Sequence, residues 1–100
     1  MDINATVEET KATFAVEGKL TVQTAPELEA AIGKLAPSVC NIDIDLTEVG
    51  YVSSAGLRVF VACSRLAASR GGEMRLLHPC DDVYEVFDMT GLAEVLTVVH

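Results

Sequence analysis

Residues 41–69 constrain the fold of this chain more than any other stretch. The first part, residues 42–46, alternates aliphatic side chains with Asp43 and Asp45, and this alternation predicts a strand. A short polar connection leads to Ser53 and Ser54, after which apolar residues recur at helical spacing. A strand that delivers hydroxyl side chains to the first turn of a helix places them beside free backbone N–H groups and the positive end of the helix dipole. Such a turn is suited to bind an anion or a partner.

The composition narrows the class of protein. One hundred residues, 50% of them hydrophobic, predict one domain over residues 1–100 with a core of its own. The net charge of −8 argues against nucleic acid and anionic membrane as partners, because both attract basic surfaces. The charge suits a basic protein partner, although many soluble proteins are simply acidic. The longest apolar run, residues 59–63, is far too short to span a bilayer.

The cysteines and the N-terminus indicate a cellular compartment. Cys40, Cys63 and Cys80 are odd in number and lack paired spacing, which predicts free thiols in a reducing cytosol. Residues 1–4 contain no basic segment and no apolar stretch, so we expect no signal peptide. Together these features predict a cytoplasmic protein that does not insert into a membrane.

The residues before the organising stretch predict a hairpin and a helix. Alternation over residues 3–7 and again over residues 12–16 predicts two strands, each with one buried face, joined by a tight polar turn. Thr24 is the expected N-cap of the first helix, and Glu27 lies three residues later and completes a capping box. Pro37 is expected to end this helix.

A second helix is expected at residues 55–70, with a wide apolar arc and with Arg58 and Arg65 on the solvent side. The strand before it would be buried on both faces without its two aspartates. We therefore expect Asp43 or Asp45 near the strand end, within reach of solvent or a partner.

The C-terminal part predicts a strand at residues 73–77, a third helix that begins at Asp81 and Asp82, and a last short strand at residues 97–99. Strands that alternate with helices predict an α/β fold. We expect a mixed, mostly parallel sheet of four to five strands, opened by the antiparallel hairpin, with helices packed against it.

Three segments together resemble one family. Residues 18–28 (GKLTVQTAPEL) resemble the segment that opens the first helix of STAS domains. Residues 45–57 (DLTEVGYVSSAGL) resemble their central strand and phosphorylation-site turn, and residues 87–92 (FDMTGL) resemble their closing segment. The match covers nearly the whole chain in the right order. The chain is similar to the stand-alone STAS proteins that act as anti-sigma-factor antagonists in bacteria.

This resemblance implies a partner-switching protein without enzymatic activity or cofactor. Unphosphorylated antagonists of this kind bind an anti-sigma factor that is also a serine kinase, and thereby free the sigma factor. The kinase uses ATP to phosphorylate a serine at the start of the second helix, and a PP2C-type phosphatase resets the antagonist. The family's phosphorylated serine falls on Ser54. The implied partner surface comprises Thr21, Gln23, Thr24, Ser53, Ser54, Ala55, Gly56 and Arg58.

The sequence departs from the common family pattern at two positions. Ser53 and Thr21 stand where the family often has acids, and the two adjacent serines leave open which one accepts the phosphate. A phosphate at a helix N-terminus is stabilised by free N–H groups, so we expect phosphorylation to cause little conformational change. We expect its charge and bulk to weaken the binding of a partner at this surface. We also expect Gly56 to let a partner approach closely, because it has no side chain.

The sequence is also compatible with other functions. Ser53 or Ser54 is also explained as a simple N-cap. The chain could be a constitutive adaptor subunit of a transporter or signalling assembly, since STAS domains serve in both. A receiver-like phospho-acceptor at Asp45 would need an acidic pair after the first strand, but the pair found there, Glu8 and Glu9, lies within the expected hairpin. His78 and Cys80 supply only two metal ligands, and the serines lack the Gly-x-Ser-x-Gly pattern of a hydrolase.

Overall fold

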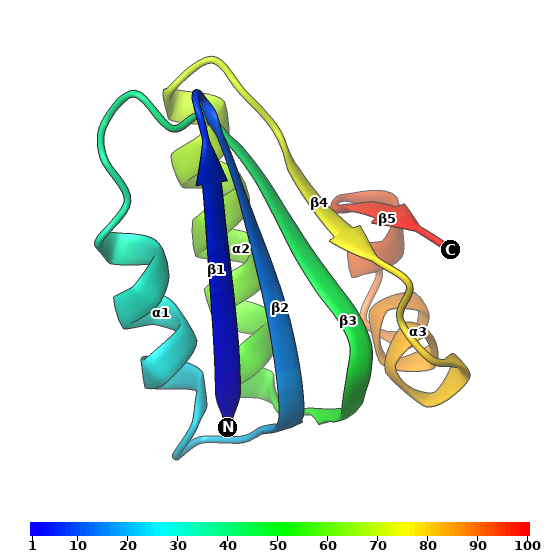
Figure 1. The fold of residues 1–100 in the computed structure, drawn as a ribbon. Helices are drawn as coiled ribbons and strands as arrows, with labels where there is room; N and C mark the ends of the chain where they lie inside the picture. Colours follow the sequence, from blue (N-terminus) through cyan, green and yellow to red (C-terminus); the bar gives the residue numbers. More distant parts are fainter.

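The computed structural model describes all residues from 1 to 100 and shows a single sheet with helices (Figure 1). The predicted order of elements is confirmed, including the last short strand. The elements are β1 (Asp2–Glu8), β2 (Lys11–Leu20), α1 (Ala25–Gly33), β3 (Asn41–Val52), α2 (Ser54–Ser69), β4 (Met74–Leu77), α3 (Asp81–Met89), the 3-10 helix η1 (Leu92–Glu94) and β5 (Thr97–Val99).

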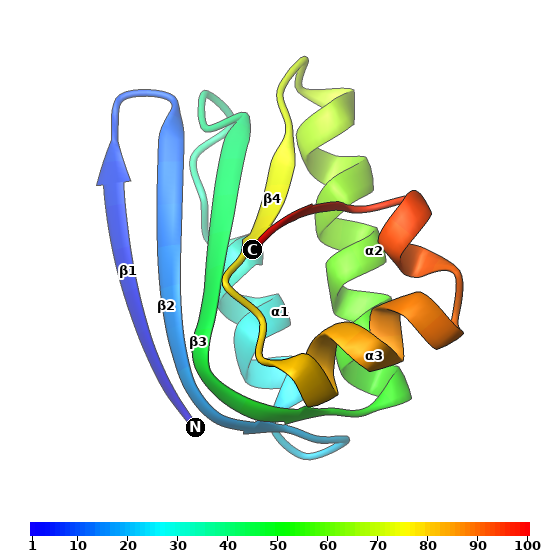
Figure 2. The same cartoon turned by 90° about the vertical axis from the view of Figure 1, so that its right-hand side faces the viewer.

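The five strands lie in the order β1-β2-β3-β4-β5. β1 and β2 form an antiparallel hairpin, and every other neighbouring pair is parallel. This confirms the predicted α/β fold with a mixed, mostly parallel sheet. Figure 2 shows the helices on one side of the sheet, so that the opposite face of the sheet is open. No helix combines the length and the apolar character that a membrane span needs.

The core lies between the sheet and the helices. Phe14 of β2 and Ile44 of β3 face Phe60 of α2 and Phe87 of α3, and all four side chains are fully buried. The two helical phenylalanines meet edge to face, with ring centroids 5.9 Å apart. Burial of each such side chain stabilises the fold by about 1.5–3 kcal/mol. The three cysteines are free thiols, as predicted.

β3 is longer than the sequence predicts and reaches Val52 instead of ending at Leu46. Its pairing with β2 shifts register twice beyond Asp45, so β3 carries two extra residues. These bulges place the buried side chains of Leu46, Val49 and Val52 three residues apart, which removes the alternation that marks a strand. The bulged strand bends and leads directly into Ser53 without an intervening loop.

β1 does not bury a face, and the prediction of a half-buried strand was wrong here. Val7 is 51% exposed, Ala5 is exposed, and only Ile3 is partly buried. β1 is the edge strand, whereas α2 packs on β3 and β4. The same alternation in β2 buries Ala12 and Phe14 because that strand lies further inside the sheet.

Candidate functional site

The two adjacent serines at the start of α2 have different surroundings. Ser53 is the N-cap with an extended backbone, and its Oγ accepts a hydrogen bond from the Gly56 N–H at 3.3 Å. Its own N–H donates to the Leu20 carbonyl at 2.8 Å. Ser54 is the first residue of the helix; it is exposed, and its hydroxyl makes no hydrogen bond within the protein. Ser53 is therefore engaged in the fold, whereas Ser54 presents a free hydroxyl.

The loop between β2 and α1 lies next to this turn. Leu20 pairs with Val52 in the parallel ladder, so the segments that follow β2 and β3 leave the same end of the sheet. This proximity brings Thr21, Gln23 and Thr24 to the side of the sheet end where the serines lie. Residues from two distant parts of the predicted partner surface are thus gathered at one edge.

Thr24 does not form the predicted capping box. Its backbone is already helical, and its Oγ1 makes no cap hydrogen bond. Instead the hydroxyl donates to the Lys19 carbonyl at 2.6 Å and accepts from the Thr21 N–H at 2.7 Å. Thr21 Oγ1 in turn accepts from the Gln23 N–H at 3.2 Å. The two threonines close the loop on itself, which holds its backbone in one shape while the Gln23 side chain is exposed.

Gly56 is buried, and the room left by its missing side chain is used within the fold, while its expected role towards a partner stays a prediction. A Cβ at this position would lie 2.6 Å from Leu20 Cδ2 and 3.0 Å from Val52 Cγ1. The missing side chain therefore makes room for Leu20 and lets the first turn of α2 approach the ends of β2 and β3. This close packing fixes where Ser54 points.

A hollow of about 240 Å³ lies beside Ser54, and its lining includes Ala55 and Arg58, two residues of the predicted surface. The lining also includes Val22, Pro26 and Glu29, which sequence reasoning missed. Val22 is 66% exposed, although it is an aliphatic residue. The one sequence feature that could have indicated this part of the surface is the aliphatic Val22 in a polar loop. Arg58 is exposed, as predicted.

Asp45, the alternative phospho-acceptor, is held by its own strand. Its Oδ1 accepts from the Thr47 hydroxyl at 2.6 Å and from the Thr47 N–H at 3.0 Å. The hydroxyl hydrogen bond is the main cause that lowers the pKa of Asp45, against the opposing effect of burial. No group of three His, Cys, Asp or Glu side chains is placed to hold a metal ion.

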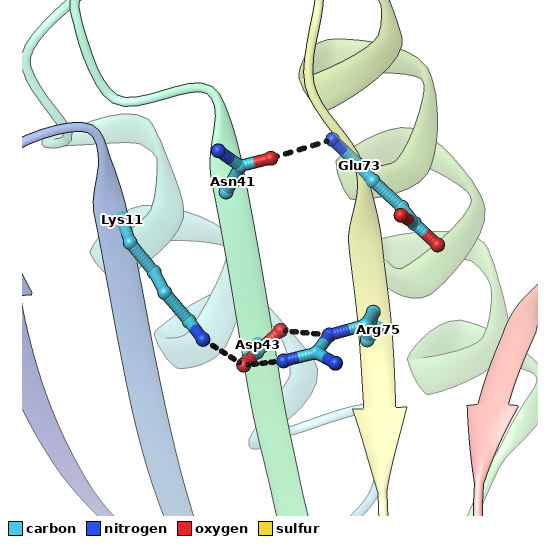
Figure 3. A pocket seen from close by; sticks show the side chains of 5 residues that line it. All are labelled: Lys11, Asn41, Asp43, Glu73 and Arg75. Atoms are coloured by element: carbon cyan, nitrogen blue, oxygen red, sulfur yellow. Dashed lines mark hydrogen bonds and ion pairs between the residues drawn. The ribbon is translucent and has the colours of Figure 1, made fainter.

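A second polar cluster lies on the open face of the sheet (Figure 3). Asp43 of β3 is only 4% exposed. Its Oδ2 lies 2.9 Å from Lys11 Nζ and accepts a hydrogen bond from an Nη of Arg75 at 2.7 Å, and its Oδ1 accepts one from Arg75 Nε at 2.9 Å. The Arg75 hydrogen bonds are the largest cause that lowers the pKa of Asp43, and they outweigh its burial. Asp43 or Asp45 was expected near the strand end, but β3 continues beyond both to Val52, and Asp43 lies near its beginning, away from Ser54.

A protein-family model described as Mlab, STAS domain matches residues 4–99. The chain belongs to the STAS-domain family. The predicted resemblance is therefore confirmed. This STAS domain is 30% identical over 100 residues to the anti-sigma-B factor antagonist of Bacillus subtilis (strain 168), and the alignment covers 98% of this chain and 92% of that relative.

Solved structures of anti-sigma factor antagonists share the fold. An anti-sigma factor antagonist from Mycobacterium paratuberculosis superposes with a TM-score of 0.85 at 24% identity, over 98% of this chain and 84% of that one. SpoIIAA in its unphosphorylated form superposes with a TM-score of 0.77 at 16% identity, over 99% of this chain and 88% of that one. The phosphorylated form of Bacillus SpoIIAA superposes with a TM-score of 0.75 at 18% identity, over 99% of this chain and 92% of that one. The fold of this chain thus matches both forms of that protein.

Proposed function

We propose that this STAS domain is an anti-sigma-factor antagonist switched by phosphorylation of Ser54. In its unphosphorylated form it binds a cytoplasmic anti-sigma factor that is also a serine kinase, and this frees a sigma factor. The kinase transfers the γ-phosphoryl group of ATP to Ser54 Oγ, and the antagonist then dissociates. A PP2C-type phosphatase removes the phosphate. The antagonist is the substrate of these enzymes and catalyses no reaction itself.

The observation that carries this proposal is the difference between Ser53 and Ser54. A kinase needs a hydroxyl that reaches solvent, and the exposed, unbonded hydroxyl of Ser54 meets that requirement. Ser53 is half-buried and caps α2 through Gly56 N–H. The structure of the turn supports Ser54 as the acceptor, which the sequence left open.

The chemistry of the turn also supports a switch without refolding. A phosphate adds about −1.5 to −2 charges and three acceptor oxygens. The N-terminus of α2 tolerates this anion because its N–H groups and dipole favour negative charge. The phosphate would project beside the hollow lined by Val22, Ala55 and Arg58, where it changes the charge and shape that a partner meets.

The test uses the anti-sigma factor from the same genome as kinase, with ATP, followed by mass spectrometry of the modified residue. We expect one phosphate on Ser54, no modification of Ser54→Ala, and normal modification of Ser53→Ala. A phosphate on Ser53 would overturn the choice of acceptor. Failure of the wild-type protein to bind or to be modified by the kinase would overturn the antagonist function.

A constitutive adaptor is the second candidate, and two positions favour it. Thr21 and Ser53 replace acids that are common in the family, and both hydroxyls are used for hydrogen bonds inside the protein. These positions therefore offer no carboxylates to a kinase. Affinity capture from the native host separates the candidates, because an adaptor would retrieve a transporter ATPase and no kinase.

A further inference from the structure

α1 and α2 lie side by side on one face of the sheet (Figure 1). A second hollow of about 310 Å³ is lined by residues of both helices. Glu29 of α1 and Val59 of α2 line both this hollow and the one beside Ser54. The two hollows therefore form one groove, which we call the α1–α2 groove. It runs from Val22 and Arg58 at the Ser54 end to Leu66 further along α2.

The groove is open because small residues line its sides. A Cβ built on Gly33 would meet no atom within 4 Å, so a side chain here would project into open space. Ala62 is exposed on the opposite side. The floor consists of Ile32, Val59 and Cys63, which are only 5%, 5% and 2% exposed. Only small parts of these three side chains reach the surface, and the more exposed Ala62 and Leu66 complete the apolar lining.

The charges along the groove have no partners inside the protein. Its lining contains one acid, Glu29, and one base, Arg58. Both ion pairs in the structure involve Asp43, so neither Glu29 nor Arg58 is paired. Burial raises the pKa of the Cys63 thiol to about 12, which leaves the floor uncharged. The groove therefore combines an apolar floor with an unpaired acid in its middle and an unpaired base at its Ser54 end.

We propose that the α1–α2 groove binds an amphipathic helix of the anti-sigma factor. The aliphatic side chains of that helix would pack on Ile32, Val59 and Cys63, a basic side chain would face Glu29, and an acidic one would face Arg58. Grooves between two helices commonly receive helices through side chains spaced three, four and seven residues apart. Val59 and Leu66 are seven residues apart on α2, so this part of the groove is about 10 Å long at 1.5 Å per residue, enough for two turns of a helix.

This inference rests on the proposed function and defines the partner surface beyond the Ser54 turn. The groove continues directly from that turn, so a helix docked in it would end next to Ser54. A phosphate there would meet the acidic side chain expected opposite Arg58. The position of the groove thus links the partner's main apolar contact to the residue that switches binding.

The first test compares Ala62→Glu with Ala68→Glu. Both alanines are exposed on α2, but only Ala62 lines the groove, and both variants change the net charge equally. Calorimetric titration with the anti-sigma factor should show at least a tenfold weaker affinity for Ala62→Glu, because it places a charge over the apolar floor. Ala68→Glu should bind like wild type. Equal binding by both variants would overturn the groove proposal while leaving the antagonist function intact.

A second variant, Gly33→Gln, fills the groove from α1 without added charge. Replacing a helical glycine should maintain or raise the melting temperature, so weaker binding would not reflect unfolding. Wild-type binding by this variant would also overturn the proposal. If the wild-type protein does not bind the anti-sigma factor, both the function and the groove proposal fail. If sedimentation shows a wild-type dimer that Ala62→Glu dissociates, the occupant is a second copy, and the proposal is overturned.

Discussion

Two groups of charged residues in this protein differ in where their charges find partners. On the open face of the sheet, Asp43 receives hydrogen bonds from both Lys11 and Arg75, and three strands are joined by this cluster. Beside the helices, Glu29 and Arg58 line one groove without an ion pair. The charges of the first group are paired within the fold, whereas those of the second group are exposed to solvent and unpaired.

This difference separates residues that stabilise the fold from residues that are available for recognition. A buried carboxylate must be paired, because an unpaired buried charge costs several kcal/mol. Changes at the Asp43 cluster should therefore lower the free energy of unfolding and leave partner binding alone. Changes to the exposed groups Ser54, Glu29 and Arg58 should do the opposite.

The largest expected effect is on partner binding. Phosphorylation of Ser54 should weaken the affinity for the anti-sigma factor several hundred-fold, a loss of about 3–4 kcal/mol. The melting temperature should change little, because the N-terminus of α2 accommodates the anion. Calorimetric titration and thermal unfolding of the same phosphorylated sample measure both quantities. Retained affinity after complete phosphorylation would refute the switch.

Gly56→Ala should cost up to about 3 kcal/mol of stability, because a methyl group at this position overlaps the Leu20 side chain and overpacks the core. Urea unfolding measures the loss. Gly50→Ala is the matched control, since a Cβ at Gly50 meets nothing within 4 Å. An equal effect of both substitutions would show that the packing of α2 on Leu20 is not the cause.

Asp43→Asn should lower the free energy of unfolding by about 2 kcal/mol, because the amide carries no charge and its NH2 group would face an N–H donor of Arg75 where the carboxylate has an oxygen. The affinity for the anti-sigma factor should not change. Asp45→Asn is the control, since its remaining side-chain oxygen can still accept both hydrogen bonds from Thr47. A weaker partner affinity in Asp43→Asn at full stability would break the separation between the two groups.

The contribution of Asp43 should also depend on pH. Its folded pKa lies below the unfolded value of 3.8, so its stabilisation is present above that pH and is lost as the pH falls below it. The stability difference between wild type and Asp43→Asn should therefore be constant near neutral pH and shrink in acid. Urea unfolding at a series of pH values from neutral into this acid range measures the difference. A difference that grows in acid would contradict the ion-pair explanation.

The smallest expected effect is at the N-cap. Ser53→Ala should lose about 1 kcal/mol of stability, because the Gly56 N–H loses its acceptor. Ser54→Ala should change stability by less than about 0.5 kcal/mol, as expected for an exposed site. Thermal unfolding of the two variants compares adjacent serines in the same turn. The opposite order would show that Ser54 caps α2.

Local patterns predicted most of the fold, and the failures have identifiable causes. The order of strands and helices was predicted correctly because alternation and helical spacing are properties of neighbouring residues. The end of β3 was missed because its two bulges remove the alternation. The buried face of β1 was predicted wrongly because edge position depends on where the helices pack. Thr24 matched a capping pattern, but Lys19 and Thr21 compete for its hydroxyl.

By itself, the sequence determined the fold class and the family, and it placed two serines at the start of α2. Only the tertiary structure decided that Ser53 caps the helix and that Ser54 has a free hydroxyl. It also decided that Gly56 makes room for Leu20, and that the unpaired Glu29 and Arg58 line one groove with an apolar floor. These properties depend on contacts between segments far apart in the chain, which local spacing does not encode.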